Sequence, residues 1–175
     1  MKPVFAVVVL APLASAHADV FAHFDIWVEA PSVVQSGDVI DVAVWAQASG
    51  PATHIGSNAL GAFAMDLPIA ASGQLVSSVD QPVFGSPTFF SWVLTVDPTG
   101  LYDVGAFQLG YPGSWVSYDN PILLFTTRLH TIDGVVGEIE LLPQHHDSVP
   151  AMISWWIDLN DFNMPSVTDA DPDAD

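Results

Sequence analysis

Tryptophans, which combine a broad apolar ring with a hydrogen-bond donor, are the residues of this chain best suited to holding a ligand. Trp27 and Trp45 each lie on an alternating stretch, opposite the face that carries most of the aliphatic side chains. An aromatic ring exposed on a sheet offers apolar area to a sugar or a protein, and its indole N–H offers a hydrogen bond. Trp45 and Trp27 are therefore the predicted ligand-binding residues. The sequence leaves open a second interpretation, in which loops cover both sheet faces and these rings belong to the periphery of the core.

Histidines could hold a transition metal, but their spacing defines no site. His145 and His146 are adjacent, and neighbours on a strand point to opposite faces, so the two would not bind one ion together. We interpret them as solvated loop residues. If export removed residues 1–16, His17 would carry a free amine beside its imidazole, and copper favours such nitrogen ligands. A bound metal is thus unknown from the sequence, with copper at His17 as an alternative.

Oxygen-bearing side chains near the C-terminal end suit a hard cation. Carboxylates and amides of this kind are typical ligands of calcium. The residues concerned begin at the end of the last predicted strand and continue to the end of the chain: Asp158, Asn160, Asp161, Asp169, Asp171, Asp173 and Asp175. We expect no cofactor, and a specific calcium site is the alternative to diffuse screening of a negative surface.

Catalytic motifs are not evident in the chain. Ser, His and Asp residues for a hydrolytic triad occur, but without the Gly-x-Ser-x-Gly turn that exposes a nucleophilic serine. A glycosidase would need two carboxylates held at a defined separation, and no sequence spacing here predicts that geometry. We therefore expect a protein without enzymatic activity. A secreted enzyme or copper protein is the third interpretation, after a protein binder and a carbohydrate binder.

The charge balance limits the partners of the chain. It has 20 acidic residues against two basic ones, Lys2 and Arg128, and a formal net charge of −18. Such a surface repels nucleic-acid backbones and anionic lipid, so neither is an expected partner. The chain contains no Cys, which excludes disulfides and thiolate metal sites. An extracellular protein or a polysaccharide is the expected partner.

Residues 1–18 are typical of a secretory signal peptide. Lys2 supplies the positive start, an apolar run follows from Val4 to Leu13, and small residues surround Ala16 and Ala18. Cleavage after either alanine fits this pattern. No later stretch is apolar for long enough to predict a membrane span. We expect an exported protein, extracellular or on the cell surface, with the periplasm as the alternative location.

Short strands must position all of these residues. In the stretch 36–47, aliphatic residues recur at every second position from Ile40 to Ala46, as in a half-buried strand. Turn residues separate similar runs, which predict strands at 19–30, 36–47, 60–69, 74–79, 89–96, 101–109, 122–131, 135–142 and 153–159. Asp133 and Gly134 predict a hairpin between two of them. We predict an all-β fold: one jelly-roll-like β-sandwich of eight or nine strands over residues 19–164, then an acidic disordered tail at 165–175.

Three parts of this pattern resemble cohesin domains. The run Gly37–Val44 is similar to the Gly-Asp-x-Val-x-Val-x-Val strand of that family, and Leu60–Leu67 is similar to its following Gly-x-Phe strand. Leu123–Phe125 and Gly137–Leu141 resemble its late hairpin, so the resemblance covers most of residues 33–142. It implies an exported bacterial protein with a jelly-roll sandwich and no catalytic activity, which adheres to a protein partner through one sheet face. The related carbohydrate-binding modules are the alternative, and no binding residue of the cohesin family maps onto this chain.

Overall fold

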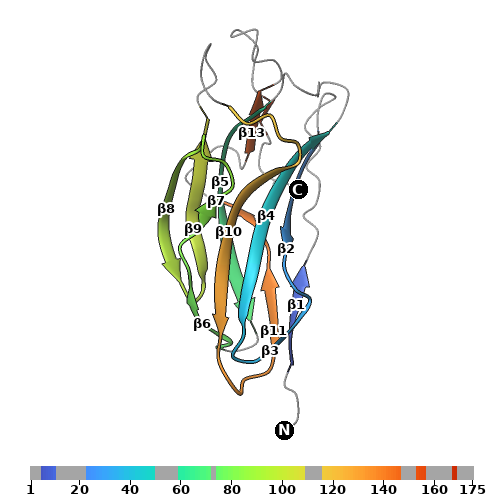
Figure 1. The fold of residues 1–175 in the computed structure, drawn as a ribbon, viewed down its shortest axis with the longest axis vertical. Helices are drawn as coiled ribbons and strands as arrows, with labels where there is room; N and C mark the ends of the chain where they lie inside the picture. The colour runs from blue at the N-terminus through green and yellow to red at the C-terminus, as the bar shows by residue number, and fades with distance from the viewer. Residues whose placement is uncertain are drawn as a thin grey trace.

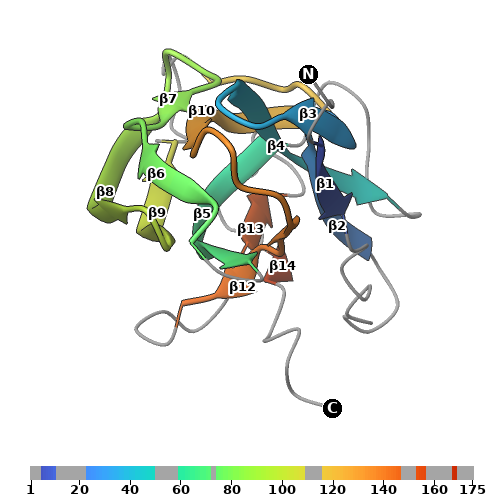
Figure 2. The ribbon, with the colours of Figure 1, turned by 90° about the horizontal axis from the view of Figure 1, so that it is seen from below.

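The structure is a computed structural model that describes residues 5–10, 23–49, 59–71, 74–108, 116–146, 153–156 and 167–168. These residues form strands joined by turns and loops, with no helix among them. Two sheets face each other as the layers of a sandwich (Figures 1 and 2). The predicted all-β fold is therefore confirmed. In this part of the chain, no helix is long and apolar enough to cross a membrane.

The first layer is a five-stranded antiparallel sheet built around its two long strands. It contains, in spatial order, β2 (His23–Glu29), β4 (Val39–Ser49), β10 (Ile122–Thr131) and β6 (Val76–Val79), with β7 (Val83–Phe84) also paired to β10. In β4, the alternating residues Ile40, Val42, Val44 and Ala46 are at most 1% exposed. Their period of two buries one face of the strand in the core and turns the other face outward.

The second layer is a nine-stranded sheet in which β5 (Ala59–Ala71) pairs with four other strands. The others are β1 (Phe5–Leu10), β3 (Val33–Gln35), β8 (Phe90–Asp97), β9 (Gly100–Phe107), β11 (Glu138–Leu141), β12 (Gln144–His145), β13 (Ile153–Trp156) and β14 (Val167–Thr168). Within the described residues, β8 pairs with β9 alone and so forms an edge of the sheet. β1 runs parallel to β11, whereas β5 is antiparallel to each of its partners.

The core lies between the two layers and contains aromatic rings from both. Phe63 of β5 stacks on Phe125 of β10, with ring centroids 6.3 Å apart and 20° between the ring planes. Both residues are at most 1% exposed, as are Met65 and Leu67 of β5. These residues of β5 and β10 therefore belong to the face of each sheet that is turned toward the core. Burial of such side chains supplies the main favourable term in folding.

The turn at Asp133 and Gly134 does not make the predicted hairpin. Gly134 has a φ of 77°, which suits a turn, but β10 lies in the five-stranded sheet and β11 lies in the other. The chain therefore crosses between the layers at this point. A turn signal reports where the chain reverses, and it carries no information about which sheet the next strand joins.

The described residues contain more strands than the predicted eight or nine, because five short strands were not predicted: β1, β3, β7, β12 and β14. Three of them, β7, β12 and β14, have two residues each and are too short to show a period. β14 falls within the predicted disordered tail, and its residues Val167 and Thr168 pair with β13. β1 falls within the predicted signal peptide, and Phe5–Leu10 pair with β3 on one side and β11 on the other. The predicted removal of residues 1–18 would therefore take β1 out of the sheet.

A bulge in β9 shapes the outer face of the second layer. The register between β5 and β9 shifts between Met65 and Leu67, so Tyr102 and Asp103 stand opposite the single residue Asp66. Asp103 has a φ of 50°, a left-handed conformation that is uncommon for a residue other than Gly. Bulges bend a strand and re-aim a side chain, and they are more frequent beside functional sites than elsewhere.

Candidate functional site

Trp27 and Trp45 are direct cross-strand partners on β2 and β4. Their rings are stacked, with centroids 6.4 Å apart and 11° between the planes. Nε1 of Trp45 donates a hydrogen bond to Oε2 of Glu29 at 3.1 Å. Both tryptophans are half-buried, and they lie on the faces of β2 and β4 that point away from the core. The structure thus brings the two predicted site residues together, and each ring covers part of the other.

A groove close to this pair crosses the outer face of β4 and β10. It has a volume of about 860 Å³ and extends from the end of β2, at Glu29–Pro31, to the segment 80–83. Ala43 and Thr126, which are cross-strand partners, line its middle. Among the described residues, no aromatic side chain lines it. Glu29 belongs to the groove and also holds Trp45, so the tryptophan pair stands beside the groove and not inside it.

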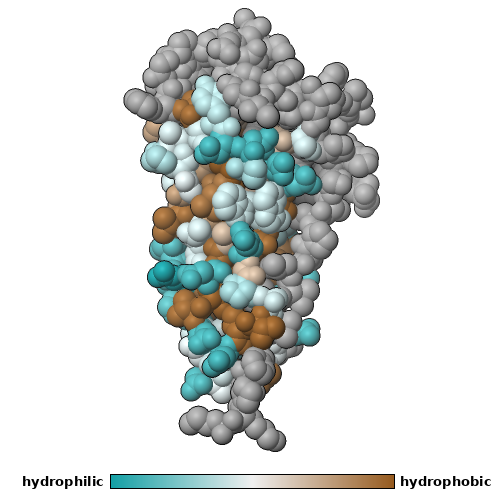
Figure 3. Space-filling view, turned by 45° about the vertical axis from the view of Figure 1, so that its right-hand side comes forward, coloured by the Kyte–Doolittle hydropathy of each residue, from teal (hydrophilic) through white to brown (hydrophobic). Residues whose placement is uncertain are grey.

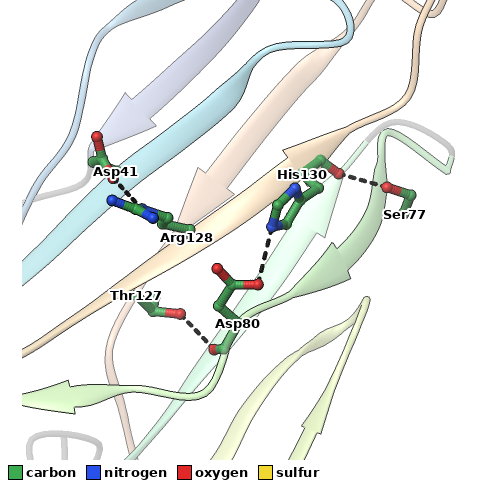
Figure 4. A network of polar contacts seen from close by, with 6 residues as sticks. All are labelled: Asp41, Ser77, Asp80, Thr127, Arg128 and His130. Carbon is green, nitrogen blue, oxygen red and sulfur yellow. Dashed lines mark hydrogen bonds and ion pairs between the residues drawn. The ribbon is translucent and has the colours of Figure 1, made fainter.

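Charged side chains at this face are held in pairs (Figure 4). Nε of Arg128 donates a hydrogen bond to Oδ1 of Asp41 at 2.8 Å, directly across β10 and β4. Nε2 of His130 lies 2.9 Å from Oδ1 of Asp80. The backbone oxygen of Asp80 accepts a hydrogen bond from Oγ1 of Thr127 at 2.7 Å. These contacts attach the segment after β6 to β10, and so they fix the far wall of the groove.

The groove carries more negative than positive charge. The hydrogen bond to Asp41, together with the attraction between the two charges, raises the pKa of the Arg128 guanidinium above its usual value, so Arg128 is a permanent cation. Three carboxylates, of Glu29, Asp41 and Asp80, line the groove with it. The side chains of Arg128 and Asp41 are 63% and 80% exposed, so their pair adds little to stability. Seen from the side of β2, hydrophilic residues lie among hydrophobic ones across the surface (Figure 3).

Trp45 also borders a second hollow, of about 570 Å³, whose other walls are residues 85–88, 116–117 and 119–123. The polar groups here mostly bond within the protein. The side chain of Asn120 donates to the backbone oxygen of Ala48 at 2.7 Å and accepts from its N–H at 3.0 Å. Ser117 donates its backbone N–H to Oε1 of Gln108 at 2.8 Å. These bonds brace the loop over the ends of β4 and β10, which favours a structural role for this hollow.

His145 and His146 are not the solvated loop residues that the sequence suggests. His145 belongs to β12, and its Nε2 is buried without a hydrogen-bond partner. Nδ1 of His146 lies 2.9 Å from Oδ1 of Asp66, and its Nε2 lies 4.0 Å from Oδ2 of Asp103. The bulge in β9 brings Asp103 to this position. Asp66 precedes His146 by 80 residues, so no local pattern could have shown the contact.

Sequence reasoning missed an exposed apolar surface on the outer face of β8 and β9. Phe90, Trp92 and Leu94 alternate along β8 and are 53%, 38% and 75% exposed. Phe107 of β9, the cross-strand partner of Phe90, is 39% exposed. Its ring stacks on Phe90 with centroids 5.3 Å apart, and its centroid lies 6.4 Å from that of Trp92. We call these four residues the apolar platform.

Comparison with protein-family models, curated proteins and solved structures finds no match to this chain. The groove and the apolar platform are therefore the observations from which a function can be inferred.

Metal ligands do not gather at either surface. In the part of the chain that the structure describes, no three His, Asp or Glu side chains are arranged to hold one metal ion. The copper alternative at His17 lies outside the described residues. The oxygen-bearing side chains at 158–161 and 169–175, which suggested calcium, also lie outside the described residues.

Proposed function

We propose that this chain is an exported, non-catalytic binding module that holds a protein partner in the acidic groove of its five-stranded sheet. The observation that carries the proposal is the groove itself, about 860 Å³ of open space across β4 and β10 between the end of β2 and the segment 80–83. Its middle is lined by small side chains, Ala43 and Thr126, and four charged residues belong to the rest of its lining: Glu29, Asp41, Asp80 and Arg128. An extended segment of a partner could lie along such a floor with its own charged side chains against the walls.

The fold is proposed to be jelly-roll-like and similar to that of cohesins. The chain passes repeatedly from one layer to the other: β4 lies in the first, β5 in the second, β6 and β7 in the first, β8 and β9 in the second, β10 in the first and β11 in the second. Such crossing is typical of jelly rolls. The first two cohesin-like motifs fall on β4 with its preceding turn and on β5, which lie in opposite layers.

A protein segment suits the groove better than a sugar does. The groove has no aromatic side chain in its lining on which a sugar ring could stack. Trp27 and Trp45 stack on each other, so each ring covers part of the face that a sugar would need. The alternative of a carbohydrate held by these two tryptophans is therefore less well supported than a protein partner.

The partner segment is expected to be basic. Arg128 faces three carboxylates in the groove, and the whole chain has a formal net charge of −18. Complementary charge speeds the encounter and selects the partner, more than it sets the final affinity. The groove is open to solvent, so added salt should screen these charges and weaken binding.

A binding role also fits the state of the carboxylates in the groove. Asp41 accepts a hydrogen bond from Arg128, and Asp80 is paired with His130. Their side chains are 80% and 48% exposed. Enzymes usually activate a carboxyl group by burying it, and these two groups lack that environment.

The test begins with the exported chain as bait for the proteins secreted by the same cells. A retained protein would be identified by mass spectrometry, purified, and titrated against wild type and the double variant Asp41→Asn/Asp80→Asn. We expect saturable binding that weakens at least about tenfold in the double variant and falls as sodium chloride is raised. Glu140→Gln removes an exposed charge from the other sheet and is the matched control.

Two results would contradict the proposal. The first is an affinity that the double variant leaves unchanged. The second is turnover in a broad hydrolase and oxidase screen that the double variant abolishes while its melting temperature stays at the wild-type value.

A further inference from the structure

The apolar platform belongs to the nine-stranded sheet, whereas the groove belongs to the five-stranded sheet. The rings of Phe90, Trp92 and Phe107 form a continuous exposed cluster, because the ring of Phe107 contacts those of both Phe90 and Trp92. Leu94 lies two residues after Trp92 on β8 and is 75% exposed. Single exposed apolar side chains are common on proteins, whereas a contiguous exposed group of large ones is a feature of surfaces that bind proteins, membranes or ligands. The platform therefore indicates a second binding surface, separate from the groove.

Trp92 is held in a fixed position on this surface. Three carbons of its indole lie within 2.7 Å of the place that a Cβ would take on Gly105, its cross-strand partner, so the ring lies across the β9 backbone where only glycine leaves room. Its Nε1 donates a hydrogen bond to Oδ1 of Asp103 at 3.0 Å. The indole is thus anchored at both its benzene part and its nitrogen, and it remains 38% exposed.

Polar groups lie directly beside the anchored ring. Asp103 accepts the hydrogen bond from Trp92, and Asp66 lies across the bulge from Asp103. His146 lies between these two carboxylates, 2.9 Å from Oδ1 of Asp66 and 4.0 Å from Oδ2 of Asp103. Gly105 and its β5 partner Ala64 are both buried, and the Trp92 ring lies over Gly105. The surface therefore offers an apolar strip with hydrogen-bonding groups at the edge of Trp92.

We infer that this surface binds a neutral polysaccharide. The C–H faces of pyranose rings pack on aromatic side chains, and Trp92, Phe90 and Phe107 supply such an area. Sugar hydroxyls donate to carboxylates and exchange hydrogen bonds with imidazole, and Asp66, Asp103 and His146 supply those groups at the edge of Trp92. A polyanion would meet two carboxylates and a chain of net charge −18, so an uncharged sugar is the favoured class.

A protein interface or a purely structural role would account for less of this surface. A stable protein interface takes roughly 20–30 residues from each partner, and the platform consists of a few side chains. A tryptophan that only shields a glycine from water would account for Trp92 over Gly105. That role would leave Phe90 and Leu94, which are the more exposed members, without a reason to be apolar.

The experiment is calorimetric titration of the full chain with cellohexaose, xylohexaose, mannohexaose and laminarihexaose, with polygalacturonic acid as the charged comparison. We expect at least one neutral hexasaccharide to bind and polygalacturonic acid not to bind. Trp92→Ala should weaken binding at least tenfold. Gly105→Ala should also weaken it, because the new Cβ displaces an indole that is still present. Leu94→Ser changes an exposed position of the platform, so it should leave folding intact and weaken binding of the sugar.

Trp27→Ala is the matched control, since it removes a half-buried tryptophan from the other sheet and should leave the affinity for the sugar unchanged. The inference is overturned if no neutral hexasaccharide binds, if polygalacturonic acid binds as well as the neutral sugars do, or if Trp27→Ala and Trp92→Ala act alike. Asp41→Asn/Asp80→Asn should bind the sugar as wild type does, so failure of the groove proposal and failure of this one are separable.

Discussion

Asp103 donates its backbone N–H to Oδ1 of Asp66 at 2.7 Å, and this bond closes the bulge where β9 loses register with β5. The same oxygen lies 2.9 Å from Nδ1 of His146. One carboxylate oxygen therefore joins β5, β9 and the residue that follows β12. The bulge, the position of Asp103 and the anchor of Trp92 all depend on this arrangement.

Replacement of Asp66 by Ala should lower the free energy of unfolding by about 1–3 kcal/mol, because a partly buried N–H and His146 would lose their partner. Asp66→Asn keeps an oxygen acceptor and should cost clearly less. The measurement is urea unfolding of both variants and wild type, with the slope of each transition checked for constancy. Equal stability of the Ala and Asn variants would show that the acceptor oxygen does not support the bulge.

Gln108 is a polar side chain inside the fold, with 2% of its surface exposed. Its Nε2 donates to the backbone oxygen of Leu60 at 2.8 Å, and its Oε1 accepts from Thr88 Oγ1 at 2.6 Å and from Ser117 N–H at 2.8 Å. Gln108→Leu keeps a similar volume but leaves these groups unpaired. We expect a loss of at least about 1–3 kcal/mol in the free energy of unfolding.

The control for this change is Gln74→Leu at an exposed position, which should stay within about 0.5 kcal/mol of wild type. Both variants would be compared with wild type by thermal and urea unfolding. A Gln108→Leu variant as stable as Gln74→Leu would mean that water replaces the lost hydrogen bonds.

The long strands could be predicted from the sequence because each has one face in the core. In β4 the alternation from Ile40 to Ala46 is unbroken, and in β5 the same period places Phe63, Met65 and Leu67 inward. Alternation shows that a strand has two unlike faces, and it needs a covered face to be informative. Strands of two residues, such as β12, offer no such period, and a turn such as Asp133–Gly134 does not reveal a change of sheet.

The residues of the two surfaces were less accessible to prediction. Trp45 and Trp92 both lie on strands in which more apolar and less apolar residues alternate. On β8, however, the apolar residues Phe90 and Leu94 beside Trp92 point outward and not into the core. The sequence of β8 does not show that it is an edge strand, since this depends on which strands pair with β9. The contact between His146 and Asp66 depends on chain segments 80 residues apart and on a bulge at a non-glycine residue.

Asp97 in the β8–β9 turn should titrate below the ordinary range for an Asp. The hydrogen bond from the Thr99 hydroxyl, and then that from the Thr99 backbone N–H at 2.7 Å, lower the pKa of Asp97. Because the pKa in the folded state is lower than in the unfolded state, ionised Asp97 stabilises the fold at pH values above about 4, and this contribution is lost as pH falls through the folded-state pKa. Thr99→Val removes the hydroxyl donor and should raise the pKa of Asp97 toward its ordinary value.

NMR titration of the carboxyl carbon of the Asp97 side chain measures its pKa in the wild type and in the Thr99→Val protein. Thr95→Val, an exposed change on the same strand, should leave the titration of Asp97 as it is in wild type. An identical Asp97 pKa in the Thr99→Val protein and the wild type would show that the hydroxyl does not determine the shift.

The last prediction concerns β1, which pairs with β11 from Val7 opposite Glu138 to Leu10 opposite Leu141. If residues 1–18 are removed on export, as their composition predicts, β11 keeps β5 as a neighbour and loses the strand on its other side. An uncovered strand edge exposes backbone N–H and C=O groups to water. We therefore expect faster amide hydrogen exchange in residues 138–141 of a chain that begins at Asp19 than in the full chain. Residues 122–131 of β10, in the other sheet, are the internal control, and equal protection of residues 138–141 in the two chains would show that β1 does not pair with β11 in solution.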